Sequence, residues 1–411
     1  MKVIKPASKK FQKLFNRFTV RNRRVEEKVR RILEDVKNTG DEALIRYTRK
    51  FDRVKLTPRE LRVTEGEING AYQNISPDFI AALKVAVENV SQFYKKQIKR
   101  SWKTLSGDGV ILGEKIRPLE SVGIYIPSGT APLPSTVYMT VLPAKLAGVE
   151  KVYLITPPNK DKNVDPHILA VANLLKVDGV FKAGGAQAIG AFAFGTRSIP
   201  RVDKIIGPGN AYVAEAKRQV FGYCDIDMIA GPTEVVILAN DHSDPDFVAA
   251  DLLAQSEHHM GTAFLVTTSK RLAKLAKKVP ARGWIVVVKN LKEAIDVINQ
   301  IAPEHLQIMV KNPQRILKDV KSAGAIFIGP YTPTAVGDYV AGPSHVLPTN
   351  GTARFFSGIC VTDFLKRSHV ISYSKKALEK VKEPLERLAS LEGLVKHMES
   401  VKIRFEKAGH K

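Results

Sequence analysis

The chain contains 411 residues, of which 44% are apolar and 26% charged, a balance that argues against a disordered or low-complexity protein. This length predicts two or three domains. The richest apolar stretch, residues 137–155, is interrupted by Lys145, Glu150 and Lys151, so we expect no membrane span. The two cysteines are too few for a disulfide framework or a thiolate zinc ribbon.

The net charge of +23 is concentrated near the two ends of the sequence. Residues 1–60 contain 19 basic and 8 acidic side chains, and residues 361–411 contain 12 and 7. Neither zinc-finger spacing nor an aromatic RNA-binding motif accompanies this excess, so a solvated basic surface is favoured over a nucleic-acid partner. The first 15 residues lack the apolar segment of a secretory signal, and we expect a cytoplasmic protein.

Helical periodicity dominates the first hundred residues. Ser76, Pro77 and Asp78 form a helix start signal, after which apolar residues recur at helical spacing. From about residue 110, short β-rich runs alternate with helical stretches. We predict strands at 122–126, 152–155, 180–182, 204–206, 235–238, 263–266, 284–288, 307–310 and 325–328. We predict helices near 135–148, 165–176, 186–195 and 210–221, and others beginning near 244, 269, 291, 313 and 375.

This alternation predicts an α/β protein whose parallel sheets are connected by right-handed crossovers. We expect two Rossmann-like domains, one inserted in the other, with an N-terminal helical arm (1–22) and a C-terminal helical tail (364–411). The first domain would comprise residues 23–114 and 236–363, and the second residues 115–235. The tail has no obvious core of its own, which is typical of a subunit interface.

Three glycine-containing turns follow predicted strands, at residues 125–132, 184–187 and 207–210. Parallel strands end at one edge of a sheet, where ligands bind and helix N-termini attract anions. The turn at Gly207 resembles the start of a G-x-G-x-x-G fingerprint, but Tyr212 occupies the place of the third glycine. A dinucleotide site and ordinary tight strand-to-helix connections therefore both stay open.

Several nitrogen and oxygen ligands occur in the second half of the chain. Gln255 and His258 lie three residues apart at the end of a predicted helix, so they share one face. Together with Asp338, His345 and His397, they could bind zinc through N and O donors. Each of them could equally be a surface or core residue, because spacing alone does not show that they converge.

The tripeptide Pro303-Glu304-His305 places an acid beside a base just before a predicted strand. If Pro303 opens a helical turn, the positive end of that turn would hold His305 neutral and able to accept a proton. Glu304 could then act on a water molecule. The alternative is an exposed pair of loop residues without a chemical role.

These segments together resemble the histidinol dehydrogenase family. The resemblance extends from about residue 20 to 404, and many long motifs in one order are more specific than any single motif. The motifs lie at residues 122–127, 134–136, 184–189, 207–211, 230–234, 251–258, 303–306, 337–339 and 345–349.

The resemblance implies oxidation of L-histidinol to L-histidine in two NAD-dependent steps through an enzyme-held aldehyde, the last step of histidine biosynthesis. It implies one zinc ion per subunit, held by Gln255, His258, Asp338 and His397. It also implies that His305 takes the alcohol proton and that Glu304 activates the water that attacks the aldehyde.

The resemblance further implies a homodimer whose tails are exchanged between the subunits. NAD would be held on the second domain by Tyr125, Gln187 and Asn210. The implied substrate contacts are Thr233, Gln255, His258, His305, Asp338, Glu392 and His397. Glu392 and His397 would reach the site of the other subunit.

Two other interpretations were weighed against this one. The first is a related zinc- and NAD-dependent dehydrogenase of another small alcohol, such as a sulfonated propanediol. Glu392 and His397 favour histidinol, because a substrate without an imidazole would not need them. The second is a zinc-binding scaffold or a nucleic-acid-associated protein that has lost activity, against which Glu304 and His305 argue. Thr233 stands where the family usually has serine, which keeps the hydroxyl but adds a methyl group.

Overall fold

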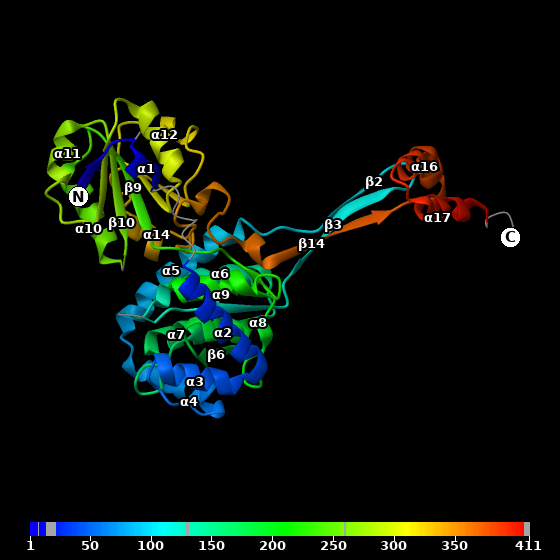
Figure 1. Cartoon of the computed structure of the whole chain (residues 1–411), viewed down its shortest axis with the longest axis horizontal. Coiled ribbons are helices and arrows are strands. Elements are labelled where there is room, and N and C mark those ends of the chain that lie inside the picture. Colours follow the sequence, from blue (N-terminus) through cyan, green and yellow to red (C-terminus); the bar gives the residue numbers. More distant parts are fainter. Residues whose placement is uncertain (7, 14–21, 129–130, 259, 407–411) are drawn as a thin grey trace. The chain divides into compact units, whose positions relative to one another are not determined.

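The computed structural model describes residues 1–6, 8–13, 22–128, 131–258 and 260–406 (Figure 1). The chain forms two compact units. The first comprises Met1–Ile98 and Pro118–Phe364, and the second comprises Lys99–Arg117 and Leu365–Lys411. The second unit therefore combines two stretches that are distant in the sequence.

One layer of the first unit is a parallel sheet with the strand order β1-β11-β10-β9-β12-β13. Val236 and Leu238 enter the core on one face of this sheet, and Val235 and Ile237 enter the core on the other. Both faces are thus buried, as parallel sheets require. Its strands are β1 (Lys2–Ile4), β9 (Glu234–Ala239), β10 (Thr262–Thr267), β11 (Gly283–Val287), β12 (His305–Ile308) and β13 (Ala325–Ile328). The helices between and after them are α10 (Pro245–Glu257), α11 (Lys270–Ala276), α12 (Leu291–Ile301), α13 (Gln314–Leu317) and α14 (Thr334–Tyr339).

The other sheet of the first unit is also parallel and has the order β6-β5-β4-β7-β8. The chain proceeds from β4 to β5 and β6 and then returns to β7 on the other side of β4. Ligands bind at the carboxyl ends of the strands beside such a reversal. The strands are β4 (Ser121–Tyr125), β5 (Lys151–Thr156), β6 (Gly179–Lys182), β7 (Lys204–Ile206) and β8 (Asp225–Ile226). The helices are α6 (Pro134–Ala147), α7 (Pro166–Leu174), α8 (Gly185–Phe194) and α9 (Ala211–Val220).

The N-terminal helices complete the layer around the five-stranded sheet. The side chain of Asn22 caps the start of α2, and Ser76 caps α5 with Pro77 at its first position. The apolar face of α2 packs in one core with Phe181 and Phe192. These helices are α2 (Arg23–Thr39), α3 (Asp41–Phe51), α4 (Glu65–Ala71) and α5 (Pro77–Lys95). The short helix α1 (Lys9–Lys13) instead contributes Phe11 to the core of the six-stranded sheet. Short 3-10 helices lie at Pro58–Leu61, Tyr72–Asn74, Thr352–Arg354 and Val361–Phe364.

The second unit consists of a three-stranded sheet and three helices. The sheet has the order β14-β3-β2, and β2 and β3 run antiparallel. Large apolar side chains of this unit are exposed in the single chain, among them Leu105, Ile371, Leu388 and Leu391, which is 85% exposed. The elements are β2 (Trp102–Leu105), β3 (Ile111–Pro118), β14 (Leu365–Ser372), α15 (Lys375–Lys380), α16 (Lys382–Leu391) and α17 (Val395–Glu406).

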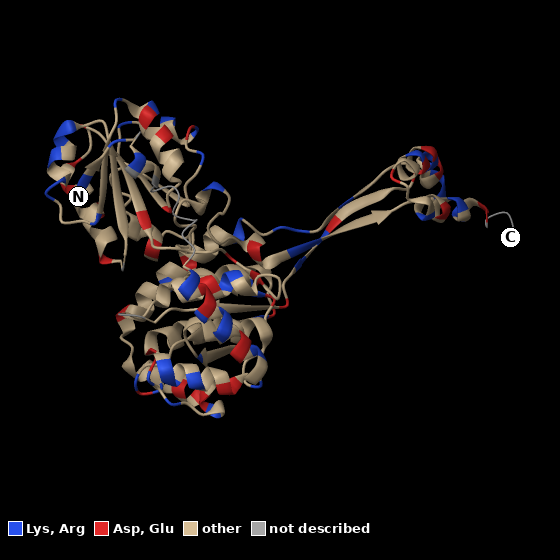
Figure 2. Ribbon diagram, viewed as in Figure 1, with Lys and Arg blue, Asp and Glu red and all other residues tan. Residues whose placement is uncertain are grey.

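The predicted fold class is confirmed: two parallel α/β sheets are accompanied by helical terminal regions. The predicted arm is not purely helical, because residues 2–4 pair with β11 as an edge strand. The strands β1, β2, β3, β8 and β14 were not predicted, and β12 begins two residues earlier than predicted. The predicted domain boundaries stay a prediction. Figure 2 shows that Lys and Arg positions are spread along the ribbon of both units. No helix of the described residues is long and apolar enough to cross a membrane.

Candidate functional site

The acid–base pair lies at the amino ends of two neighbouring strands. Glu304 precedes β12, and His305 is its first residue, in register with Val235 of β9. Glu304 is 6% exposed and His305 5%, so the alternative of an exposed loop pair is wrong. The Thr233 hydroxyl donates to Oε2 of Glu304 at 2.5 Å, and the Glu234 amide donates to the same oxygen at 2.9 Å. The two residues that enter β9 thereby fix the carboxylate that enters β12.

The tautomer of His305 follows from its hydrogen bond to the backbone. Its Nδ1 lies 3.3 Å from the carbonyl oxygen of Glu234 and 3.6 Å from Oε2 of Glu304. A carbonyl oxygen only accepts hydrogen bonds, so Nδ1 carries a proton in both charge states, and in the neutral ring Nε2 carries the lone pair. Nε2 is buried and has no hydrogen-bond partner among the described residues, and Oδ1 of Asp338 lies 3.6 Å away. Nε2 is therefore the nitrogen that can gain or lose the second proton of the ring.

The charge on His305 differs from the expectation. Residues 302–304 form no helical turn, so a helix N-terminus does not hold the imidazole neutral. Burial alone would lower the pKa of His305, but the nearby carboxylates of Glu304 and Asp338 raise it to about 9. Burial raises the pKa of Glu304, which the charge of His305 and two hydrogen bonds oppose only in part. His305 is therefore not held neutral as expected, because the two neighbouring carboxylates favour its charged form.

A second histidine links the segment after α14 to the other sheet. Nδ1 of His345 lies 2.9 Å from the carbonyl oxygen of Asp338, and its Nε2 lies 3.2 Å from the hydroxyl of Thr136. The carbonyl must accept from Nδ1, so Nε2 accepts from Thr136 in the first turn of α6. Burial lowers the pKa of His345, which favours this neutral form. Both ring nitrogens are therefore occupied, and His345 serves as a connector.

Three of the four expected zinc ligands lie in the first unit. Gln255 in the last turn of α10 is buried, and its amide donates to the Thr233 hydroxyl at 3.2 Å. Burial would raise the pKa of Asp338, but His305, followed by smaller effects of His345 and His258, lowers it. These contacts bring Thr233, Gln255, Glu304, His305 and Asp338 together, with His258 nearby.

The two remaining residues expected to contact zinc or the substrate, Glu392 and His397, are in the second unit. Glu392 follows α16 and His397 lies in α17, and both are exposed in the single chain. Within the described ranges, no group of three or more His, Cys, Asp or Glu side chains is arranged to hold a metal ion. The four-residue ligand set therefore stays a prediction.

The three residues expected to hold NAD follow β4, β6 and β7, at the carboxyl edge of the five-stranded sheet. The hydroxyl of Tyr125, at the end of β4, accepts from the Gly185 amide at 3.1 Å, and burial raises its pKa to about 12. Gln187 is 1% exposed, and neither atom of its amide has a hydrogen-bond partner among the residues described. Asn210 caps α9 by accepting from the amides of Tyr212 and Val213.

Sequence reasoning missed one polar contact behind the site. Gln307 is fully buried in β12, and its amide donates to Oδ2 of Asp251 in α10 at 2.7 Å. Burial raises the pKa of Asp251, while this hydrogen bond opposes the shift. The contact ties the strand of His305 to the helix of Gln255. The signal was a glutamine between Leu306 and Ile308 in a predicted buried strand.

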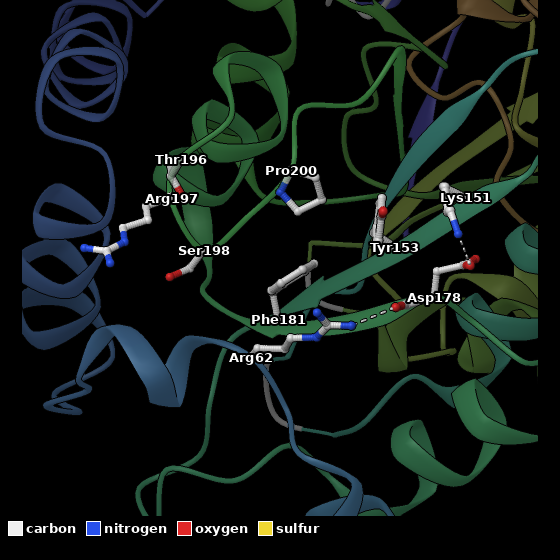
Figure 3. A pocket seen from close by; sticks show the side chains of 9 residues that line it. All are labelled: Arg62, Lys151, Tyr153, Asp178, Phe181, Thr196, Arg197, Ser198 and Pro200. Atoms are coloured by element: carbon white, nitrogen blue, oxygen red, sulfur yellow. Dashed lines mark hydrogen bonds and ion pairs between the residues drawn. The ribbon is translucent and has the colours of Figure 1, made fainter.

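A pocket at the amino ends of β5 and β6 is separate from these groups (Figure 3). Two of its basic side chains contact Asp178: Arg62 donates to the Asp178 carbonyl at 3.1 Å, and Lys151 lies 3.5 Å from the Asp178 carboxylate. The three turns lie at the opposite edge of the sheet, so this pocket is not the expected NAD site.

Two parallel sheets, polar turns at the carboxyl edge of one and a buried acid–base pair at the amino edge of the other define a two-lobed α/β oxidoreductase. A family model described as histidinol dehydrogenase matches residues 15–405. The chain therefore belongs to the histidinol dehydrogenase family.

The similarity between this chain and its relatives extends over almost its whole length. The chain is 48% identical to the histidinol dehydrogenase of Listeria monocytogenes over 401 residues, 93% of each chain. It is 46% identical to that of Clostridium acetobutylicum over 416 residues, which covers 97% of this chain and 96% of the relative. The solved histidinol dehydrogenase of Elizabethkingia anophelis is similar with a TM-score of 0.92 and 36% identity, covering 100% and 99% of the two chains.

Proposed function

We propose that the chain oxidises L-histidinol to L-histidine in two NAD-dependent steps through an enzyme-held aldehyde, the last step of histidine biosynthesis. The observation that carries the proposal is the buried Glu304–His305 pair, in which Nε2 of His305 has no hydrogen-bond partner among the described residues. Family membership supplies the substrate class, and this pair supplies groups for proton transfer and hydration.

Each residue of the pair has one task. In the first oxidation a hydride leaves the carbinol carbon for NAD, and Nε2 of His305, in the neutral form of the ring, takes the hydroxyl proton. In the second oxidation Glu304 draws a proton from the water that adds to the aldehyde, and the hydrate gives a second hydride to NAD. The balance is one alcohol, one water and two NAD converted to one carboxylate, two NADH and three protons. Thr233 and the Glu234 amide keep the carboxylate beside His305.

Zinc fits the chemistry of the available donors. Gln255, His258 and Asp338 offer an amide oxygen, an imidazole and a carboxylate, and His397 of a second subunit would complete the set. When bound, the ion would anchor the amino group and an imidazole nitrogen of the substrate. Thr233, Gln255, His258, His305, Asp338, Glu392 and His397 are the proposed substrate contacts.

NAD binding is assigned to Tyr125, Gln187 and Asn210. Support comes from their positions at the strand-order reversal and from the unpartnered amide of Gln187, which is unusual for a buried group. A homodimer is supported by the exposed apolar side chains of the second unit. We place the protein in the cytoplasm.

The test is the stoichiometry of NADH formed per L-histidinol consumed by zinc-loaded protein. We expect two NADH, loss of turnover after chelation and recovery with zinc. Glu304→Gln should impair oxidation of histidinal more than that of histidinol, whereas His305→Asn should impair the alcohol step. Asp296→Asn, on the exposed side of α12, is the matched control. No NADH from histidinol, or turnover only with a sulfonated propanediol, would overturn the proposal.

A further inference from the structure

Asp52 presents a carboxylate that the protein itself leaves unsatisfied. It follows the last residue of α3, and its own amide donates to the Thr48 carbonyl. Its Oδ2 is buried without a hydrogen-bond partner among the described residues, and no ion pair within that part of the chain includes it. Buried polar oxygens are almost always hydrogen-bonded, so this one requires an explanation.

The carboxylate faces the turn between β6 and α8. A Cβ placed on Gly184 would lie 3.6 Å from Oδ1 of Asp52, so the turn backbone passes close to the carboxylate. The next residue, Gly185, donates its amide to Tyr125, and its φ of +64° folds the turn toward the Gln187 amide. Two unpartnered polar groups, the Asp52 carboxylate and the Gln187 amide, thus flank one glycine turn at the carboxyl edge of the sheet.

The chemistry of these groups selects the ligand. A carboxylate only accepts hydrogen bonds and repels phosphate, so its partner carries two adjacent donors and no negative charge there. The vicinal hydroxyls of a ribose meet this requirement, and an acidic residue performs this task in other dinucleotide-binding sheets. Burial raises the pKa of Asp52 to about 6, so the group is ionised at neutral pH and gains from such donors.

The position of Asp52 relative to the sheet indicates whether it faces the nicotinamide ribose or the adenosine ribose of the dinucleotide. The nicotinamide must reach His305. Asp338 beside His305 accepts a hydrogen bond from His345, and His345 in turn bonds to Thr136 in α6, the helix that follows β4. Asp52 lies by the turn after β6, two strands from β4 in the order β6-β5-β4. Neighbouring strands are about 4.8 Å apart, so this turn is about 10 Å from the end of β4. Asp52 is therefore matched with the distal, adenosine half of the cofactor.

We propose that Asp52 accepts hydrogen bonds from the 2′- and 3′-hydroxyls of the adenosine ribose and so selects NAD over NADP. This inference rests on the proposed use of NAD. The 2′-phosphate of NADP would bring like charge against the carboxylate and remove one of the two donors.

The experiment measures the binding of NAD, NADP and ADP-ribose by calorimetry to full-length wild type, Asp52→Asn and Asp52→Ala. Glu42→Gln, which removes an exposed carboxylate from the same helix, is the matched control. We expect both Asp52 variants to bind NAD and ADP-ribose at least about tenfold more weakly, because hydrogen bonds to a charged group are lost. The preference for NAD over NADP should narrow, and the loss should fall on the KM for NAD more than on kcat.

If Asp52 had a purely structural role, both variants should unfold at lower urea concentration than wild type. If Asp52 serves a ligand, both variants should unfold in urea at least as late as wild type, because the free protein gains nothing from an unpartnered carboxylate. Equal ADP-ribose binding by wild type and variants would overturn the proposal, as would an unchanged NADP preference. Failure of wild type to bind NAD at all would instead refute the proposed function.

Discussion

Lys217 and Asp227 form an ion pair beneath the turn that begins at Gly207, and each side chain is 2% exposed. The Lys217 ammonium donates to the Gly207 carbonyl at 2.9 Å, and the Asp227 carboxylate accepts from the Gly207 amide at 2.8 Å. The pair thus holds both backbone groups of one glycine. Gly207 has a φ of +123°, and a Cβ there would meet the carbonyl of Tyr125 at 2.2 Å. A buried charge pair therefore fixes the turn that leads to Asn210.

Removal of one partner of this pair should be strongly destabilising. We expect Lys217→Met to lower the free energy of unfolding by about 3 to 5 kcal/mol, because Asp227 would stay buried without its counter-charge. The double variant Lys217→Met with Asp227→Asn should recover part of the loss. Urea unfolding followed by circular dichroism measures both. A loss below about 1 kcal/mol in the single variant would show that the pair contributes little.

Tyr94 supports the segment that carries His345. Its buried hydroxyl donates to the Ile359 carbonyl at 2.7 Å and accepts from the Ser344 amide at 2.8 Å. Tyr94→Phe should cost about 1 to 3 kcal/mol, because it leaves two buried backbone groups unpaired. Tyr331→Phe, at an exposed tyrosine, is the control and should leave the melting temperature unchanged. Equal melting of the two variants would contradict the supporting role of Tyr94.

Asp52 should give a pH-dependent difference in stability. Burial raises its pKa to about 6 in the folded protein, against an ordinary value of 3.8. The folded state thus binds this proton more tightly, so the stabilisation is complete below about pH 3.8 and is lost as the pH rises through about 6. Relative to wild type, Asp52→Asn should gain stability between pH 4.5 and pH 7.5. Urea midpoints at these two pH values test this, and a constant difference would contradict it.

The proposed exchange of tails can be tested by complementation. Neither His305→Ala nor His397→Ala should turn over histidinol alone. After the two proteins are unfolded together and refolded, half of the dimers combine both chains, and each such dimer has one intact site if His397 acts across the interface. Recovery of about a quarter of wild-type activity is expected. If His397 acts within its own chain, mixing restores nothing.

The sequence predicted well the elements whose local pattern agrees with their environment. The strands of the two parallel sheets are short apolar runs between helices, and both of their faces are buried. The strands that the analysis missed lack this pattern. In β14 seven of eight residues are exposed, and β1 is an edge strand of three residues. Their pairing is set by distant segments, which local periodicity does not report.

Some residues of the candidate site could likewise be predicted from the sequence, and others could not. Glu304 and His305 were found because an adjacent acid and base are visible in the sequence. The error at Pro303 arose because a proline favours both helix starts and strand entrances. The roles of Asp52 and Lys217 depend on burial and on backbone groups far along the chain, so no spacing rule could have indicated them.

The second unit is built from two stretches that are far apart in the sequence, and this affects how the chain folds during its synthesis. Its sheet pairs residues 99–117 with a segment that begins at Leu365, so the first strands leave the ribosome long before the last one is made. Until Leu365–Ser372 has been made, the hairpin of β2 and β3 lacks β14, the strand on the other side of β3, while the intervening residues 118–364 can already fold. Nascent chains should therefore be held by chaperones at this hairpin, and assembly should begin only after release.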